Sequence, residues 1–184
     1  MEQTNEKQKS KKSKTRTIDI AYIGLFAALI TASAQIAIPM TVSFTLQTFA
    51  ICLAAGLLGW KRGTLSVVVY IIIGMIGLPV FTGFKSGIAA VAGPTGGFIV
   101  GFIFTALISG LLIDKFGRKL WQMIIFMAVG VIACYAFGTI WFIIAYKATI
   151  ASALTTCVVP FLLPDAVKVV LAAVLSNRLR RFVK

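Results

Sequence analysis

Residues 97–113 read GFIVGFIFTALISGLLI, and this stretch of seventeen residues contains no charged side chain. A helix rises about 1.5 Å per residue, so such a run nearly covers the roughly 30 Å hydrocarbon core of a bilayer. The composition of the whole chain agrees with this, because 59% of its 184 residues are hydrophobic and only 12% are charged. We therefore interpret the chain as an integral membrane protein.

Charged residues and helix breakers divide the rest of the chain into similar apolar blocks. These blocks predict an all-α fold, a polytopic bundle of six transmembrane helices that forms one membrane domain over residues 18–184. The predicted spans are residues 20–38, 46–59, 64–82, 97–113, 121–145 and 159–177. The second span is short for a crossing, so it either extends through residues 41–45 or is partly irregular.

Residues 1–17 are rich in Lys, Ser, Thr and Gln and nearly free of apolar side chains. Such a segment cannot bury enough surface to fold alone, so we predict a disordered basic tail. Its charge favours attraction to anionic membrane lipid over nucleic-acid binding, because the tail has no aromatic residue on which a base could stack. A cleaved signal peptide is the other alternative, but the apolar run continues past Ala32-Ser33-Ala34 to Ile38 and favours a retained span.

The positions of the cations predict the orientation of the bundle. Of the 18 Lys and Arg residues, Lys85 and Lys147 fall in loops on one side and Lys168 falls inside the sixth span. The other 15 all lie on the side of the N-terminus if there are six spans. Cytoplasmic segments carry the excess of Lys and Arg, so we expect both termini in the cytoplasm of a multi-pass cell-membrane protein.

The sequence lacks the residue types that most catalytic sites need. There is no His, the three Cys stand singly, and Asp114 and Asp165 are the only acids beyond residue 19. A zinc site, a Ser/His/Asp triad and a paired-carboxylate hydrolase are therefore disfavoured, and no P-loop sequence for ATP hydrolysis occurs. We predict a protein that is not an enzyme and has no metal or cofactor. The alternative is a membrane-embedded enzyme with Asp165 as a lone general base.

Asp165 and Lys168 form the strongest chemical signal, because an ionised side chain within a span is costly unless it is paired or hydrated. Their i, i+3 spacing places both on one helix face. If the helix starts near Pro160, Lys168 lies roughly 12 Å below its outer end. The pair either only neutralises itself or binds a small anionic ligand with an amide- or urea-like head. Pro164 could then open a helical segment whose free N–H groups face the same cavity.

Other residues of the outer half are expected to converge on this cavity. Gln47 offers two donors and an acceptor, and the glycines of residues 93–97 let the backbone approach a ligand closely. The outer loops, residues 39–47, 82–95 and 146–160, act either as a lid over the pocket or as ordinary connectors. Besides Asp165 and Lys168, the candidate ligand-binding residues are Phe44, Thr45, Gln47, Phe81, Gly93, Pro94, Thr95 and Tyr146.

Several separated motifs resemble, in order, those of the BioY family. They are TLQT at residues 45–48, GWKRG at 59–63, GMIGLPVF at 74–81, GPTGGF at 93–98 and PDAVK at 164–168. BioY proteins are the substrate-binding S components of prokaryotic energy-coupling-factor (ECF) transporters for biotin. The resemblance covers about residues 20–180.

This resemblance implies that the chain binds biotin from the outside, with Asp165 facing the ureido ring and Lys168 and Gln47 on the carboxylate side. It also implies partners, namely a transmembrane coupling protein and two cytosolic ATPases. A carrier for another small carboxylate-bearing vitamin is the alternative. After Val80-Phe81, where many relatives carry an Asn, this chain has Thr82-Gly83-Phe84-Lys85, so no ureido contact is expected from that loop.

Gly24, Ala28 and Ala32 form a stripe of small residues along the first predicted span. Such a stripe lets another helix approach closely. The composition alone favours internal packing. The resemblance instead implies that the stripe meets the coupling protein, so we assign these three residues to partner binding.

Overall fold

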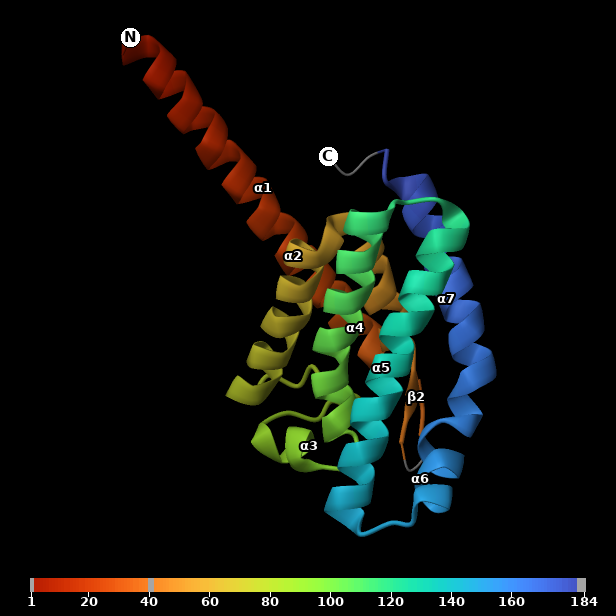
Figure 1. The fold of residues 1–184 in the computed structure, drawn as a ribbon. Helices are drawn as coiled ribbons and strands as arrows, with labels where there is room; N and C mark the ends of the chain where they lie inside the picture. Colours follow the sequence, from red (N-terminus) through yellow and green to blue (C-terminus); the bar gives the residue numbers. More distant parts are fainter. Residues whose placement is uncertain (1, 40–41, 182–184) are drawn as a thin grey trace.

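The structure is a computed structural model that describes all residues except 1, 40–41 and 182–184, with the backbone alone described for residues 2–16. It is mostly helical, with one small antiparallel β-hairpin (Figure 1). In chain order the elements are α1 (Glu2–Gln35), β1 (Ala37–Ile38), β2 (Phe44–Thr45), α2 (Gln47–Ile76), α3 (Ile88–Ala92), α4 (Gly96–Phe116), α5 (Leu120–Tyr146), α6 (Ile150–Cys157) and α7 (Val159–Leu179).

Helix α2 consists of two arms that run in opposite directions. Gly59, between the arms, has φ 75° and ψ −175°, a conformation that only glycine adopts readily. Four residues later, a Cβ added to Gly63 would lie 3.1 Å from the carbonyl oxygen of Ala54, a proximity that requires the chain to reverse. Figure 1 shows the two arms diverging from this turn. We call residues 47–58 the first arm and residues 60–76 the second arm.

Six passes through the bundle result from this reversal. Among the described residues, five helical stretches are long and apolar enough to cross a membrane. Helix α2 is counted once among these five, although its two arms pass through the bundle twice. The last stretch, Ile150–Leu179, combines α6 and α7. The predicted six-helix bundle is therefore confirmed.

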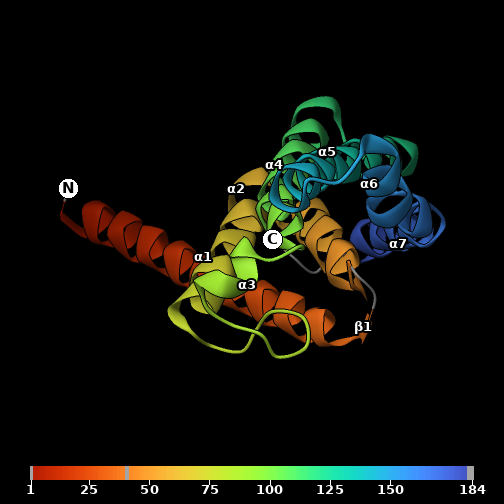
Figure 2. The same ribbon diagram turned by 90° about the horizontal axis from the view of Figure 1, so that it is seen from below.

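The bundle has two ends with different structures. The N-terminal part of α1 projects from one end, where the end of α7, the turn of α2 and the connection between α4 and α5 also lie (Figure 1). The hairpin, α3 and α6 lie at the opposite end, and Figure 2 looks onto them. Large apolar side chains point outward along the helices between the ends. Leu163, for example, is 80% exposed, as expected where lipid replaces water.

Several predicted boundaries differ from the structure, and turn chemistry accounts for the differences. The first span ends at Gln35, because β1 begins at Ala37, and the second begins at Gln47, directly after β2. Residues 42–45 therefore do not extend the second span. The third span ends at Ile76 and not at residue 82, because Gly77 adopts a left-handed conformation that terminates the helix.

Helix α1 also begins earlier than the composition predicted. It runs back to Glu2 and projects beyond the bundle, where we expected a disordered tail (Figure 1). Lys, Glu and Gln are strong helix formers, and the segment continues a helix that is already nucleated by the first span. Only the part from Thr17 to Gln35 is apolar enough to cross a membrane. Met1 lies outside the described residues.

Candidate ligand-binding site

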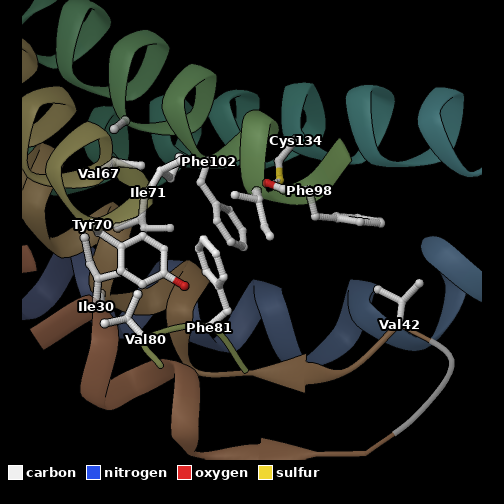
Figure 3. Close-up of a cluster of buried hydrophobic side chains, with 14 of the residues drawn as sticks. Ile30, Val42, Val67, Tyr70, Ile71, Val80, Phe81, Phe98, Phe102 and Cys134 are labelled. Atoms are coloured by element: carbon white, nitrogen blue, oxygen red, sulfur yellow. Dashed lines mark hydrogen bonds between the residues drawn. The ribbon is translucent and has the colours of Figure 1, made fainter. Parts of the chain in front are cut away.

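A cavity of about 610 Å³ lies in the half of the bundle that contains the hairpin and α3. Both arms of α2 line it, with α4, α5 and α7, and the segment before α2 and the loop that contains α3 cover it. Phe81 and Phe102 point toward one another there, with Tyr70 beside them (Figure 3). The Tyr70 and Phe81 rings meet edge to face, with 5.6 Å between their centroids. The cavity has the size of a small-molecule site, and its walls combine aromatic with polar side chains.

Asp165 and Lys168 lie side by side on α7 and both line this cavity. The Lys168 Nζ donates to Asp165 Oδ1 at 2.7 Å and to the Thr45 carbonyl oxygen at 2.6 Å. It also lies 3.7 Å from the ring centroid of Phe44, within range of a cation–π contact. Two of the three Lys168 N–H bonds thus have acceptors within the protein, and the ammonium also lies against the Phe44 ring.

Asp165 has a second partner that was not among the predicted binding residues. The Tyr135 hydroxyl, on α5, donates to Asp165 Oδ2 at 2.6 Å. The carboxylate is therefore held from two helices, and its charge stays in the protein interior with only 4% of the residue exposed. Because a carboxylate oxygen has two lone pairs, Oδ2 can accept a further N–H bond from a ligand.

Gln47 and its neighbours form a second polar group in the cavity wall. Gln47 Nε2 donates to the Tyr70 hydroxyl at 2.7 Å, while Oε1 accepts from the Thr45 hydroxyl at 3.0 Å and the Thr82 hydroxyl at 3.2 Å. These bonds link the hairpin, both arms of α2 and the loop before α3. They also commit the acceptor and one donor of Gln47 to the protein.

The loop that contains α3 is held in place by bonds to two helices. Gln35 Nε2 donates to the carbonyl oxygens of Val80 and Phe81, at 3.3 Å and 3.1 Å, and Gln35 Oε1 accepts from the Phe84 N–H at 3.1 Å. The Trp141 indole N–H donates to the Gly93 carbonyl oxygen at 3.0 Å. The loop is thereby positioned to cover the cavity.

Lys85, in the same loop, is the second cation of the cavity lining. It is exposed, and its side chain has no ion pair or hydrogen bond with any residue that the structure describes. Lys85 was not among the predicted binding residues, because a single Lys in a loop carries no signal by itself.

The structure brings most of the predicted binding residues together. Two are not part of the lining. Phe44 lies against Lys168 and stacks on Phe161 at 6.2 Å, whereas Tyr146 stacks on Phe142 at the end of α5 and is half exposed. The predicted residues that line the cavity are Thr45, Gln47, Phe81, Gly93, Pro94, Thr95, Asp165 and Lys168.

Two further expectations differ from the structure. The one for Pro164 is wrong, and the one for the three loops is only partly met. Pro164 does not open a helical segment, because α7 begins at Val159 and contains Pro164 in its interior. Of the three outer loops, the first two contribute residues to the cavity lining, whereas no residue of α6 does. The first two loops therefore act as a cover, and α6 connects α5 to α7.

The stripe of small residues on α1 faces outward. Gly24, Ala28 and Ala32 are all exposed, and a Cβ added to Gly24 would meet no atom within 4 Å. The buried face of α1 is formed instead by residues such as Phe26 and Ile30. The internal packing that composition favoured is thus wrong.

Comparison with known proteins places the chain in a family. The model of the BioY family matches residues 5–184. The biotin transporter BioY of Thermotoga maritima is 42% identical over 160 residues, which cover 86% of this chain and 93% of that protein. The probable biotin transporter BioY of Pyrococcus horikoshii is 37% identical and covers 88% of this chain and 96% of its own length.

A solved structure agrees with these relatives. The crystal structure of the S-component for biotin from an ECF-type ABC transporter superposes with a TM-score of 0.86 at 30% identity. The match covers 91% of this chain and 93% of that one. On the motifs, the fold and these matches, the chain belongs to the BioY family.

Proposed function

We propose that this chain binds biotin in the cavity and takes it up across the cell membrane as the substrate-specific component of an ECF transporter. The relatives named above are biotin transporters, and the matched structure is an S-component for biotin. One observation in the chain itself supports this most strongly. The buried pair Asp165–Lys168 borders a cavity large enough for a small molecule, and a pair that only neutralised itself needs no such space.

The contacts available in the cavity suggest how biotin lies in it. Asp165 can accept from the ureido N–H groups, and Tyr135 and Lys168 hold its carboxylate in place. The aromatic wall of Phe98 and Phe102 suits the apolar ring and chain of the ligand.

The carboxylate of biotin is better served by a residue other than Lys168 and Gln47, which the resemblance implied. Lys168 and Gln47 spend most of their hydrogen-bonding capacity on the protein. Lys85 is unpaired among the described residues and lies in the cavity lining. Lys85 is therefore the cation that binds the carboxylate of biotin.

The chain is not an enzyme, and it needs partners for energy. Its sequence has no P-loop, and its family consists of transporter components. The partners are a transmembrane coupling protein and two cytosolic ATPases. The exposed stripe of Gly24, Ala28 and Ala32 suits close contact with a helix of the coupling protein within the membrane lipid. No cofactor is needed, because biotin is the cargo.

The orientation follows from the charges and the two ends of the bundle. The cation-rich segments lie at the end of the bundle from which α1 projects (Figure 1), whereas the segment before α2 and the loop that contains α3 line the cavity at the other end. By the excess of Lys and Arg on cytoplasmic segments, the termini are cytoplasmic and biotin enters from outside.

Native mass spectrometry of the protein purified from a biotin-containing host tests this function. We expect a bound species with the mass of biotin, and co-purified coupling subunits where the host supplies them. The purified protein is then offered an equimolar mixture of biotin with lipoate and pantothenate, two other carboxylate-bearing vitamins. Selective retention of a vitamin other than biotin, or of none, would overturn the assignment.

A further inference from the structure

A second hollow, of about 350 Å³, lies at the end of the bundle opposite to the biotin cavity. The turn of α2 forms one wall with Leu57, Leu58 and residues 60–62. The ends of α4 and α7 and the connection that follows α4 form the other walls, so the hollow lies at the end of the bundle from which α1 projects (Figure 1). We call it the cationic cleft.

The wall formed by the α2 turn is held firmly in place. The Trp60 N–H donates to Asp114 Oδ2 at 3.0 Å, and Arg118 forms an ion pair with Asp114 Oδ1. A Cβ added to Gly110 would lie 2.5 Å from the Trp60 Cα, so the turn rests directly on α4. The cleft is therefore a built feature and not the surface of a loose loop.

The charges of the cleft do not balance. Asp114 is its single acid and is neutralised by Arg118, while Arg62 pairs with Asp19 of α1 at 2.8 Å. Lys61 lies 5.2 Å from the ring centroid of Trp60, and no carboxylate among the described residues pairs with Lys61 or Arg180. Two positive charges thus face the cleft without a counter-charge from the described chain.

The chemistry of these walls suits one class of ligand. A phosphate offers negative charge and several acceptor oxygens, which Arg and Lys bind well. The Leu57 and Leu58 side chains border the cleft beside the charges, and Trp is favoured at the membrane interface. Basic pockets between helices on the cytoplasmic side of a membrane bind anionic headgroups.

We propose that the cationic cleft binds the phosphate of an anionic phospholipid headgroup. Lys61 and Arg180 contact the phosphate, and Trp60 packs beside the glycerol. The cleft lies at the level where the cation-rich end of the bundle meets the headgroups, so a lipid can reach it from the bilayer without leaving the membrane. Free phosphate shares the binding chemistry but lacks the acyl chains that would bring it to this level.

Native mass spectrometry with defined lipids tests the proposal. The full-length protein in detergent is mixed with phosphatidylglycerol or with phosphatidylcholine of the same acyl chains. The Lys61→Ala/Arg180→Ala variant should lose about tenfold or more in phosphatidylglycerol affinity. The matched control is Lys115→Ala/Arg178→Ala, which removes the same charges at the same end of the bundle but outside the cleft. It should bind like the wild type, as should the charge-conserving variant Lys61→Arg/Arg180→Lys.

A third arm adds millimolar inorganic phosphate to each protein. Phosphatidylglycerol adducts that depend on Lys61 and Arg180 and persist in phosphate support the lipid. Binding of phosphate that depends on Lys61 and Arg180, without a preference for phosphatidylglycerol over phosphatidylcholine, would support a site for free phosphate. That result would contradict a phospholipid ligand. Equal losses in the cleft variant and its matched control, or binding of neither ligand, would overturn the site altogether.

Discussion

The Tyr135 hydroxyl reaches from α5 to α7 and donates to Asp165 Oδ2 at 2.6 Å. This bond leaves the carboxylate with one fixed orientation, because Lys168 occupies Oδ1 from the other side. A ligand N–H that approaches Oδ2 therefore meets a preorganised acceptor, which reduces the entropy lost on binding.

Tyr135→Phe should weaken biotin binding about tenfold, since a hydrogen bond to a charged group contributes roughly 1.5 kcal/mol or more. Calorimetric titration of the purified protein with biotin measures the change. Tyr22→Phe is the matched control, because Tyr22 belongs to α1 and packs against a core cluster outside the cavity lining. Equal affinities for Tyr135→Phe and wild type would show that Asp165 needs no support from α5.

Lys85→Gln should reduce the affinity for biotin about fivefold, as expected for an exposed charge pair worth about 1 kcal/mol. The same substitution should leave the affinity for biotinamide unchanged, because that ligand has no carboxylate. Lys147→Gln, which removes a cation outside the cavity lining, serves as the control. A loss of equal size for biotin and biotinamide would exclude Lys85 as the carboxylate contact.

Gly59→Ala should destabilise the fold by about 2 kcal/mol, because Gly59 has φ 75° and ψ −175° and a side chain is strained there. Thermal unfolding in detergent reports the loss. Gly24→Ala should instead be neutral or slightly stabilising, because Gly24 is helical and has open space around it. An unchanged melting temperature for Gly59→Ala would contradict the reversal of α2 at this residue.

Ala28→Trp should abolish co-purification of the coupling protein, because the bulky ring separates helices that the small stripe allows to touch. Biotin binding should stay at the wild-type level, since Ala28 is exposed on α1 and does not line the cavity. Ile132→Trp, at an exposed position of α5, is the control. Assembly that fails equally in both variants would mean that the stripe has no special role.

Much of the fold could be predicted because the breaks between apolar blocks are local signals. The charged run after Gly59 separates the second span from the third, and the structure has its reversal there. The ends of the spans were less predictable. Helix ends depend on backbone conformations such as that of Gly77, and the hairpin forms through a pairing of Ala37 with Thr45 that no local pattern reveals.

The candidate site could be predicted where a residue is unusual in its setting. Asp165 and Lys168 stand out because charges are rare within a span, and Gln47 stands out for a similar reason. Tyr135 does not stand out, because α5 is apolar on all sides and its rotation cannot be deduced from hydropathy. Thr82 and Tyr70 reach Gln47 only through the tertiary arrangement of the loop and the second arm.

The most direct test of the central claim is the biotin affinity of the double variant Asp165→Asn/Lys168→Gln. Removing one partner of a buried ion pair costs about 3–5 kcal/mol of stability, whereas removing both charges avoids an unpaired charge, so the double variant should fold. The matched control is Asp19→Asn/Arg62→Gln, which removes an ion pair outside the cavity.

Calorimetric titration should show one biotin per chain for the wild type and the control. For the double variant it should show a loss of about a hundredfold, because the charged acceptor for the ureido N–H groups is lost together with the Lys168 ammonium that holds it. If the double variant melts like the wild type and still binds biotin with the same affinity, the pair only neutralises itself and does not bind the ligand.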